Sequence, residues 1–353
     1  MPITRPVALA LASLLLFAAC SSESPAPAPD VVQPAIVTDT VPHDSDDPAV
    51  WIHPGDPALS LIIGTDKDSL GGLYVFGLDG RLLADRSVTG LQRPNNVDVE
   101  YGLVLGGDTV DVAVTTERYA NQLRVFRLPD MTAIDGGGIP VFAGDSLRAP
   151  MGVALYRRPA DGAIFAVVSR KTGPSGSYLW QYQLMDGGNG AVTGEKVREF
   201  GMFSGGDGEI EAIAVDDALG YVYYSDEALG VRKYHADPDH ADAGVELAVF
   251  GTDGFAEDRE GISIFTATDS TGWLLVSDQQ AARFQVFPRE GTPGDPHNHP
   301  MLQAVRVAAR ESDGSETVSV PLSERFPAGL FVAMSEGRVF HLYDWRDLGI
   351  PAR

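Results

Sequence analysis

Short stretches in which apolar and polar residues alternate recur along most of the chain, and each ends in a turn. Alternation with a period of two predicts strands that have one buried face. Six such stretches align with one another and begin at Leu73, Leu123, Leu179, Val231, Phe284 and Val339. They follow one another at intervals of roughly fifty residues, a period that is typical of repeats forming one propeller blade each.

Two further strands are predicted before each aligned stretch. The first is short and begins with polar residues, at 46–52, 95–101, 150–156, 211–215, 260–265 and 316–320. The second is apolar with a polar end, at 61–67, 110–118, 164–171, 221–227, 273–279 and 329–335. No stretch keeps a helical period over more than two turns. The sequence therefore predicts an all-β fold, a six-bladed β-propeller; a β-sandwich is the alternative, but it would not need six equivalent units.

Polar residues at the ends of these strands should gather on one face of the propeller. Consecutive strands of a blade are antiparallel, so the start of the first strand and the end of the second lie at the same edge. First-strand starts place there Asp46, Asp47, Asn95, Asn96, Glu209, Glu211, Asp258 and Glu260. Second-strand ends place there Lys67, Arg118, Lys171, Glu227 and Gln279.

The chemistry of this set points to a divalent cation together with an anion. Clustered carboxylate and amide oxygens suit Ca²⁺, whereas the seven histidines and one cysteine show no zinc-ligand spacing. Lys and Arg have no use at a bare cation site, but a phosphate that bridges metal ions and side chains satisfies both groups. Any one of the Asp or Asn residues could simply cap a turn. Their recurrence in several blades favours the functional interpretation.

The N-terminus predicts export and a lipid anchor. Arg5 precedes an apolar run at 7–17, which ends in Ala18-Ala19-Cys20. This run is too short to span a bilayer and is typical of a signal peptide. We expect a signal peptide at 1–19, lipidation of Cys20, a flexible Pro/Ala/Ser-rich linker at 20–40 and the propeller at 41–353. The expected location is across the inner membrane, anchored in the periplasm or at the outer membrane. A plain secretory signal with an incidental cysteine is the alternative.

The strongly acidic composition limits the possible partners. A formal net charge of -23 disfavours nucleic acid, and it disfavours a membrane surface except through the N-terminal lipid. An anionic ligand stays possible where divalent cations stand between it and the protein. The only cysteine is Cys20, so no disulfide can form within one chain, and we expect a monomer.

Two local motifs resemble those of a known family. Residues 44–51 (DSDDPAVW) and 95–99 (NNVDV) are similar to signatures of the β-propeller phytases, which are alkaline, calcium-dependent 3-phytases. The resemblance extends over residues 44–348. It implies a calcium-dependent phosphomonoester hydrolase that binds several Ca²⁺ ions, takes phytate or another inositol polyphosphate as its calcium complex, and uses a calcium-bound water as nucleophile.

The resemblance also implies roles for particular residues and two neighbouring phosphate sites. Lys67, Arg118 and Lys171 match the family's phosphate-binding cations and, with Glu211, its catalytic residues. The calcium ligands implied are Asp47, Glu211, Glu227, Asp258 and Glu260.

Two departures from the family pattern keep other functions open. Met151-Gly152 stands where the family has Tyr-Gly, and the acidic segment at 313–318 is shortened, so we expect the last blade to contribute less to the calcium sites. A calcium-binding propeller that captures phosphorylated or cell-surface ligands with little or no hydrolysis is one alternative. A six-bladed calcium lactonase or esterase is another.

Overall fold

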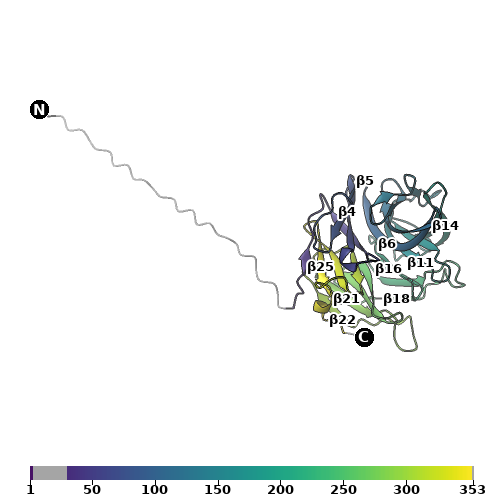
Figure 1. Cartoon of the computed structure of the whole chain (residues 1–353). Coiled ribbons are helices and arrows are strands. Elements are labelled where there is room, and N and C mark those ends of the chain that lie inside the picture. The colour runs from purple at the N-terminus through teal and green to yellow at the C-terminus, as the bar shows by residue number, and fades with distance from the viewer. Residues whose placement is uncertain (3–29, 352–353) are drawn as a thin grey trace. The chain divides into compact units, whose positions relative to one another are not determined.

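Strands make up almost all of the regular structure in the part of the chain that can be described (Figure 1). A computed structural model describes residues 1–2 and 30–351, and those from Val31 onward belong to one unit. Cys20 and all but the first two residues of the predicted signal peptide lie outside the described residues. Within these ranges no helix is long and apolar enough to cross a membrane.

The strands form six antiparallel sheets, which are the six blades of a β-propeller, as the repeats predicted. Blades 1 and 2 are built from β2 (Ser45–Trp51), β3 (Leu61–Asp66), β4 (Gly71–Gly77) and β5 (Val88–Leu91), and from β6 (Pro94–Leu105), β7 (Asp108–Glu117), β8 (Gln122–Arg127), β9 (Thr132–Ala133) and β10 (Ile139–Pro140). Blades 3 and 4 are built from β11 (Pro150–Arg157), β12 (Ile164–Arg170), β13 (Leu179–Asp186) and β14 (Val192–Phe200), and from β15 (Ile213–Asp216), β16 (Tyr221–Asp226), β17 (Gly230–His235) and β18 (Ala248–Phe250). Blades 5 and 6 are built from β19 (Arg259–Thr266), β20 (Gly272–Asp278), β21 (Arg283–Pro288) and β22 (Gln303–Arg306), and from β23 (Ser315–Val318), β24 (Leu330–Ser335), β25 (Val339–Asp344) and β1 (Ile36–Val37). Short 3₁₀ turns occur at Pro57–Leu59, Gln279–Ala281 and Trp345–Leu348.

The last blade is completed by the beginning of the propeller chain. Strand β1 pairs antiparallel with β25, with Ile36 opposite Leu342 and Val37 opposite His341. These two residues fall within the segment 20–40 that we predicted to be linker. The folded unit thus begins earlier than predicted, because β1 supplies the outer strand that blade 6 would otherwise lack.

Each seam between neighbouring blades holds its own apolar cluster, so the core is a ring of six clusters. At the seam between blades 1 and 6 the blades approach very closely at Gly64. A β-carbon there would lie 2.1 Å from the ring of Phe340. Phe340 is fully buried and packs against Phe76, with ring centroids 6.0 Å apart. This packing fixes the angle between blades and therefore the spacing of the strand ends at the propeller face.

Candidate active site

The first strand of most blades begins with a bulge that turns a side chain toward one face. In β2, β6, β11 and β19 the pairing with the second strand shifts register near the start, leaving two residues outside the ladder. Bulges re-aim side chains in this way beside many active sites. The position two residues before regular pairing resumes is occupied, in blades 1 to 6, by Asp46, Asn95, Met151, Glu211, Glu260 and Asp313.

Close backbone approach is part of this arrangement. Gly152 follows Met151 in the bulge of β11, and a β-carbon on Gly152 would lie 1.7 Å from the carbonyl oxygen of Glu211. Only glycine lets blade 4 bring Glu211 this near to blade 3.

A second set of side chains comes from the residue directly after the second strand of each blade. In blades 1 to 6 these residues are Lys67, Arg118, Lys171, Glu227, Gln279 and Glu336. A third set lies two residues before the bulge position and consists of Asp44, Arg93, Ala149, Glu209, Asp258 and Glu311. Cations are concentrated in blades 1–3 and carboxylates in blades 4–6, although Asp44 and Asp46 belong to blade 1. We call the cations of blades 1–3 the cationic sector: Lys67, Arg93, Arg118 and Lys171. We call six of the carboxylates of blades 4–6 the acidic sector: Glu209, Glu211, Glu227, Asp258, Glu260 and Asp313.

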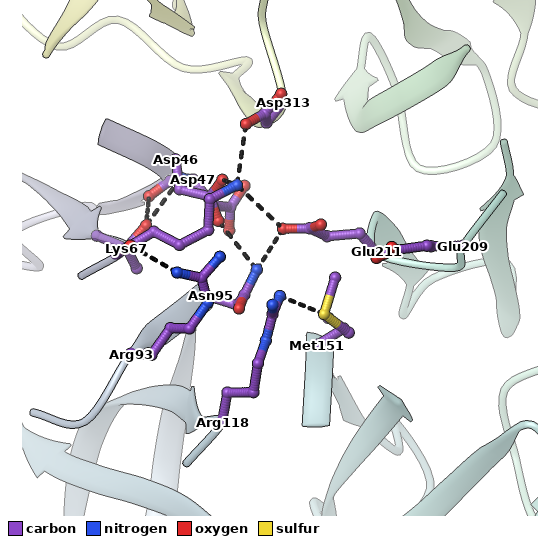
Figure 2. A network of polar contacts seen from close by, with 12 residues as sticks. Asp46, Asp47, Lys67, Arg93, Asn95, Arg118, Met151, Glu209, Glu211 and Asp313 are labelled. Atoms are coloured by element: carbon purple, nitrogen blue, oxygen red, sulfur yellow. Dashed lines mark hydrogen bonds and ion pairs between the residues drawn. The ribbon is translucent and has the colours of Figure 1, made fainter. Parts of the chain in front are cut away.

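Lys67 joins the two sectors (Figure 2). Its ammonium forms an ion pair with the buried Asp46, lies 3.1 Å from Oδ2 of Asp313 and lies 3.9 Å from Oε1 of Glu211. Burial alone would lower the pKa of Lys67, but these carboxylates outweigh it and raise the pKa above its ordinary value. Asn95 supports the cluster by donating hydrogen bonds to Glu211 and, at 3.3 Å, to Asp46.

Three carboxylates of blade 4 converge next to this cluster. One oxygen from each of Glu209, Glu211 and Glu227 lies within 4.8 Å of the other two. Burial and the neighbouring charges of Glu211 and Asp258 raise the pKa of Glu227 to about 8. Burial alone would raise the pKa of Glu211 as well, but the charges of Lys67 and Arg118 lower it below its ordinary value. The group thus combines closely spaced oxygens with mutual repulsion, which a bound cation would relieve.

The other predicted calcium ligands lie in different surroundings. Glu260 is buried, and burial together with the charges of Glu227 and Glu211 raises its pKa. Asp258 is half-buried at the edge, where its carboxylate accepts a hydrogen bond from Gln280 at 2.8 Å. Asp47 is not one of the three converging carboxylates of blade 4. It lines the central cavity and accepts a hydrogen bond from the backbone N–H of Val97 at 3.0 Å.

The remaining predicted cations have few carboxylate contacts. Lys171 is half-exposed and forms an ion pair with Glu209. Arg118 is buried, with Nη2 against the sulfur of Met151. Burial lowers the pKa of Arg118, although Glu211 partly offsets the effect. Among the six equivalent positions occupied by Asp46, Asn95, Met151, Glu211, Glu260 and Asp313, only Met151 has a side chain without an oxygen or nitrogen atom.

Three further residues belong to this face but had no predicted role. Glu209 was placed at this edge by its position in the repeat and proves to be one of the three converging carboxylates. Asp313 contacts Lys67 and accepts a hydrogen bond from Gln279, so the last blade does contribute a carboxylate to the site. Arg93 precedes the NNVDV motif and donates a hydrogen bond to the carbonyl oxygen of Lys67 at 3.4 Å.

Clustered carboxylates opposite a group of Lys and Arg side chains are typical of a propeller that acts on phosphorylated ligands. A phosphate can interact with Lys and Arg directly and with carboxylates through a metal ion that they hold. Comparison with known proteins agrees with this class. The phytase family model matches residues 4–340, nearly the whole chain, and the chain belongs to the phytase family. The 3-phytase of Bacillus subtilis (strain 168) is 30% identical over 296 residues, which cover 82% of this chain and 74% of that protein.

Membership in this family makes the chain a phosphatase of the phytate-hydrolysing class. It supports hydrolysis over the binding-only and lactonase alternatives that the sequence left open.

Proposed function

We propose that the protein releases phosphate from phytate, or from another inositol polyphosphate, in a calcium-dependent reaction at the face where the two sectors meet. The observation that supports this proposal is the convergence of Glu209, Glu211 and Glu227 beside Lys67, one of the cations predicted to bind phosphate. A substrate with several phosphates can interact with Lys and Arg directly and with the carboxylates through bound metal ions. The substrate would therefore arrive as a calcium complex.

The donor set of the acidic sector fits Ca²⁺. Hard carboxylate oxygens in flexible geometry are the ligands that Ca²⁺ prefers, and no thiolate or imidazole is among them. Glu209, Glu211 and Glu227 would hold one ion, with Glu260 and Asp258 available for others and Asp47 for an ion nearer the central cavity. When bound, Ca²⁺ supplies charge neutralisation on the phosphate and lowers the pKa of coordinated water.

The residues of the chain supply binding and orientation. We propose that Lys67, Arg118 and Lys171 bind oxygens of the phosphate being cleaved, since catalysis of phosphoryl transfer consists mainly of positioning and charge stabilisation. Glu211 couples the two sectors, because it lies 3.9 Å from Lys67 and within 4.8 Å of Glu209 and Glu227. No side chain is required to form a covalent intermediate.

We also propose that the mature enzyme is a monomer whose Cys20 carries the lipid anchor. The propeller would then be tethered through the segment before Val31, and the membrane would be contacted only through the lipid. Mass spectrometry of the protein purified from membranes would detect the diacylglyceryl mass on Cys20. A Cys20→Ser variant should move to the soluble fraction, and equal membrane association of both forms would contradict the proposal.

The enzymatic proposal is tested by phosphate release from phytate over a calcium titration. We expect activity to disappear with a chelator and to return with Ca²⁺. Glu211→Gln and Lys67→Met should each lower kcat/KM by roughly 10²- to 10³-fold, the usual effect of removing one charged transition-state contact. Matched controls are Glu195→Gln on β14 and Arg81→Ala on an exposed turn, and both should leave kcat/KM unchanged. Full activity in metal-free protein would refute calcium dependence, and full activity in folded Glu211→Gln would refute its assigned role.

A further inference from the structure

The face opposite the candidate active site carries an apolar groove across blades 6, 1 and 2. First strands begin at the active-site face, so the turns that follow them, such as 52–60, lie at the other face, together with the turns after the third strands. Two hollows with volumes of about 540 and 610 Å³ occur there, and both are lined by His53 and Pro129. Volumes of this size are typical of sites for small organic ligands.

The wall of the first hollow is mainly apolar. It includes Ile36 of blade 6 and Leu61, Leu78 and Leu83 of blade 1. Leu59 extends this wall from a short 3₁₀ turn, where its side chain is 56% exposed. A single exposed leucine needs no explanation, but one that continues an apolar wall indicates a binding surface.

The charged groups at this hollow are mainly positive. Arg86 is half-buried at the wall, and among residues 30–351 its guanidinium forms no ion pair and no hydrogen bond. Arg325 also lines the hollow and donates to the carbonyl oxygen of Ala35 at 2.9 Å, which is a neutral acceptor. The carboxylate at the wall, that of Asp79, is paired with Arg81 at 3.6 Å. In a chain with a net charge of -23, this local excess of positive charge favours an anion.

His53 contributes a hydrogen-bond donor to both hollows. Its Nδ1 accepts from two backbone N–H groups of the following turn, at 2.9 and 3.1 Å. The proton of the neutral imidazole therefore lies on Nε2, which forms no hydrogen bond among the described residues. In the second hollow the carboxylate of Asp111 is already used, because it accepts from Trp51 Nε1 at 2.9 Å and from the N–H of Gly102 at 3.2 Å. The groove thus offers donors, while its carboxylates are engaged.

This combination fits an anionic amphiphile better than a peptide. A peptide brings a backbone N–H with almost every residue, and these donors would need acceptors that the side chains of the groove do not supply. A carboxylate on a hydrocarbon chain brings only acceptors, for which Arg86 and His53 supply donors, and the chain can cover Leu59 and Leu61. Arginine suits a carboxylate because two parallel N–H groups can bind both of its oxygens.

We propose that this groove binds a linear fatty-acid-type ligand, with its carboxylate at Arg86 and its hydrocarbon chain along Leu59 and Leu61 toward His53. The groove lies on the face opposite the one where phosphate would be released. The inference therefore does not depend on the proposed function.

Isothermal titration calorimetry with decanoate tests the inference. It uses the mature chain (residues 20–353) with Cys20→Ser in calcium-free buffer, so that neither lipid, detergent nor calcium salts of the ligand interfere. We expect one-to-one binding that weakens roughly 3- to 4-fold for each CH₂ group removed between decanoate and octanoate, as burial of a methylene predicts. Arg86→Gln should weaken decanoate binding about 10-fold, the loss of a charge-assisted contact at a half-exposed site. Decanol, which has no charge, should bind about 10-fold more weakly than decanoate and should be unaffected by Arg86→Gln.

Two further variants fix the location of the site. Leu59→Asp places a carboxylate in the groove at an exposed position that the fold tolerates, and it should abolish decanoate binding. Arg310→Gln is the matched control for Arg86→Gln, because the exposed Arg310 pairs with Glu336 on the other face, and it should bind like the wild type.

Three results would overturn the inference: no binding of decanoate at about 1 mM, equal affinity for decanoate in wild type and folded Arg86→Gln, or equal affinity of the wild type for decanoate and decanol. Binding that survives Leu59→Asp would also overturn it, and this variant decides if Arg86→Gln does not fold. Phytate turnover of the same proteins with Ca²⁺ is an independent readout. Its absence in the wild type would refute the proposed function and leave the binding result unaffected.

Discussion

Lys233 should make the stability of the propeller depend on pH in a direction that can be stated in advance. The side chain lies on β17, is fully buried, and donates a hydrogen bond to the carbonyl of Pro296 at 2.6 Å. Its Nζ lies 3.1 Å from Nε2 of His299 and 3.7 Å from the centre of the Tyr221 ring. Burial lowers the pKa of Lys233 to about 7, although Asp216 and Asp295 offset part of the effect. The lysine therefore loses its charge in the folded protein near neutral pH.

The magnitude follows from the difference between the folded and unfolded states. An ordinary lysine keeps its proton up to a pKa of 10.5, so between pH 7 and 10.5 this side chain is protonated in the unfolded chain and largely neutral in the folded one. The contribution of Lys233 to the free energy of unfolding consequently rises with pH across this window, and below pH 7 the full cost of burying its charge is present. Between pH 7 and pH 9 the expected gain is about 2 kcal/mol.

Urea denaturation at pH 7 and pH 9 measures this gain. Lys233→Met removes the titrating group, so its free energy of unfolding should rise about 2 kcal/mol less than that of the wild type over the same interval. Lys196→Met is the matched control, because Lys196 is partly exposed on β14 and should leave the pH dependence unchanged. Measuring all proteins in chelator removes any contribution from pH-dependent metal binding. Parallel pH profiles for wild type and Lys233→Met would refute the reasoning.

Two further predictions concern the fold and the site. A protein that begins at residue 41 lacks β1 and should melt at a lower temperature than one that begins at residue 31, because the outer edge of β25 loses its backbone partner; equal melting temperatures would contradict the role of β1 in closing the last blade. Gly152→Ala should lower both melting temperature and phytate turnover, since its β-carbon would lie 1.7 Å from the carbonyl of Glu211. Gly244→Ala, in an open exposed turn, should leave turnover unchanged.

The sequence was sufficient for the architecture because the repeat is visible in the alternation of apolar and polar residues. The same alignment located Lys67, Arg118, Lys171 and Glu227, since each directly follows an apolar second strand whose end is easy to recognise. Strand β1 could not be predicted in this way. It has only two residues, too few to show a period, and its pairing with β25 depends on closure of the whole ring.

The site residues that the sequence did not reveal were hidden for physical reasons as well. In the last blade the predicted first strand began at 316, while the position equivalent to Asp46 is Asp313, which lies before β23 begins. A shift of a few residues at a weak strand was enough to hide it. Arg93 was missed because its orientation comes from a left-handed backbone conformation before proline, which no alternation pattern reveals.

Closure of the ring through β1 and β25 also sets the order in which the protein can be completed as it is made. Ile36 leaves the ribosome early, but its partner Leu342 follows only after about 300 further residues, or roughly 15 to 60 seconds at usual rates of translation. During that interval five blades can assemble while the first strand waits without a partner. The first strand of the propeller therefore depends on β25, one of the last elements of the chain to be made, and a chain that stops before β25 cannot close the ring.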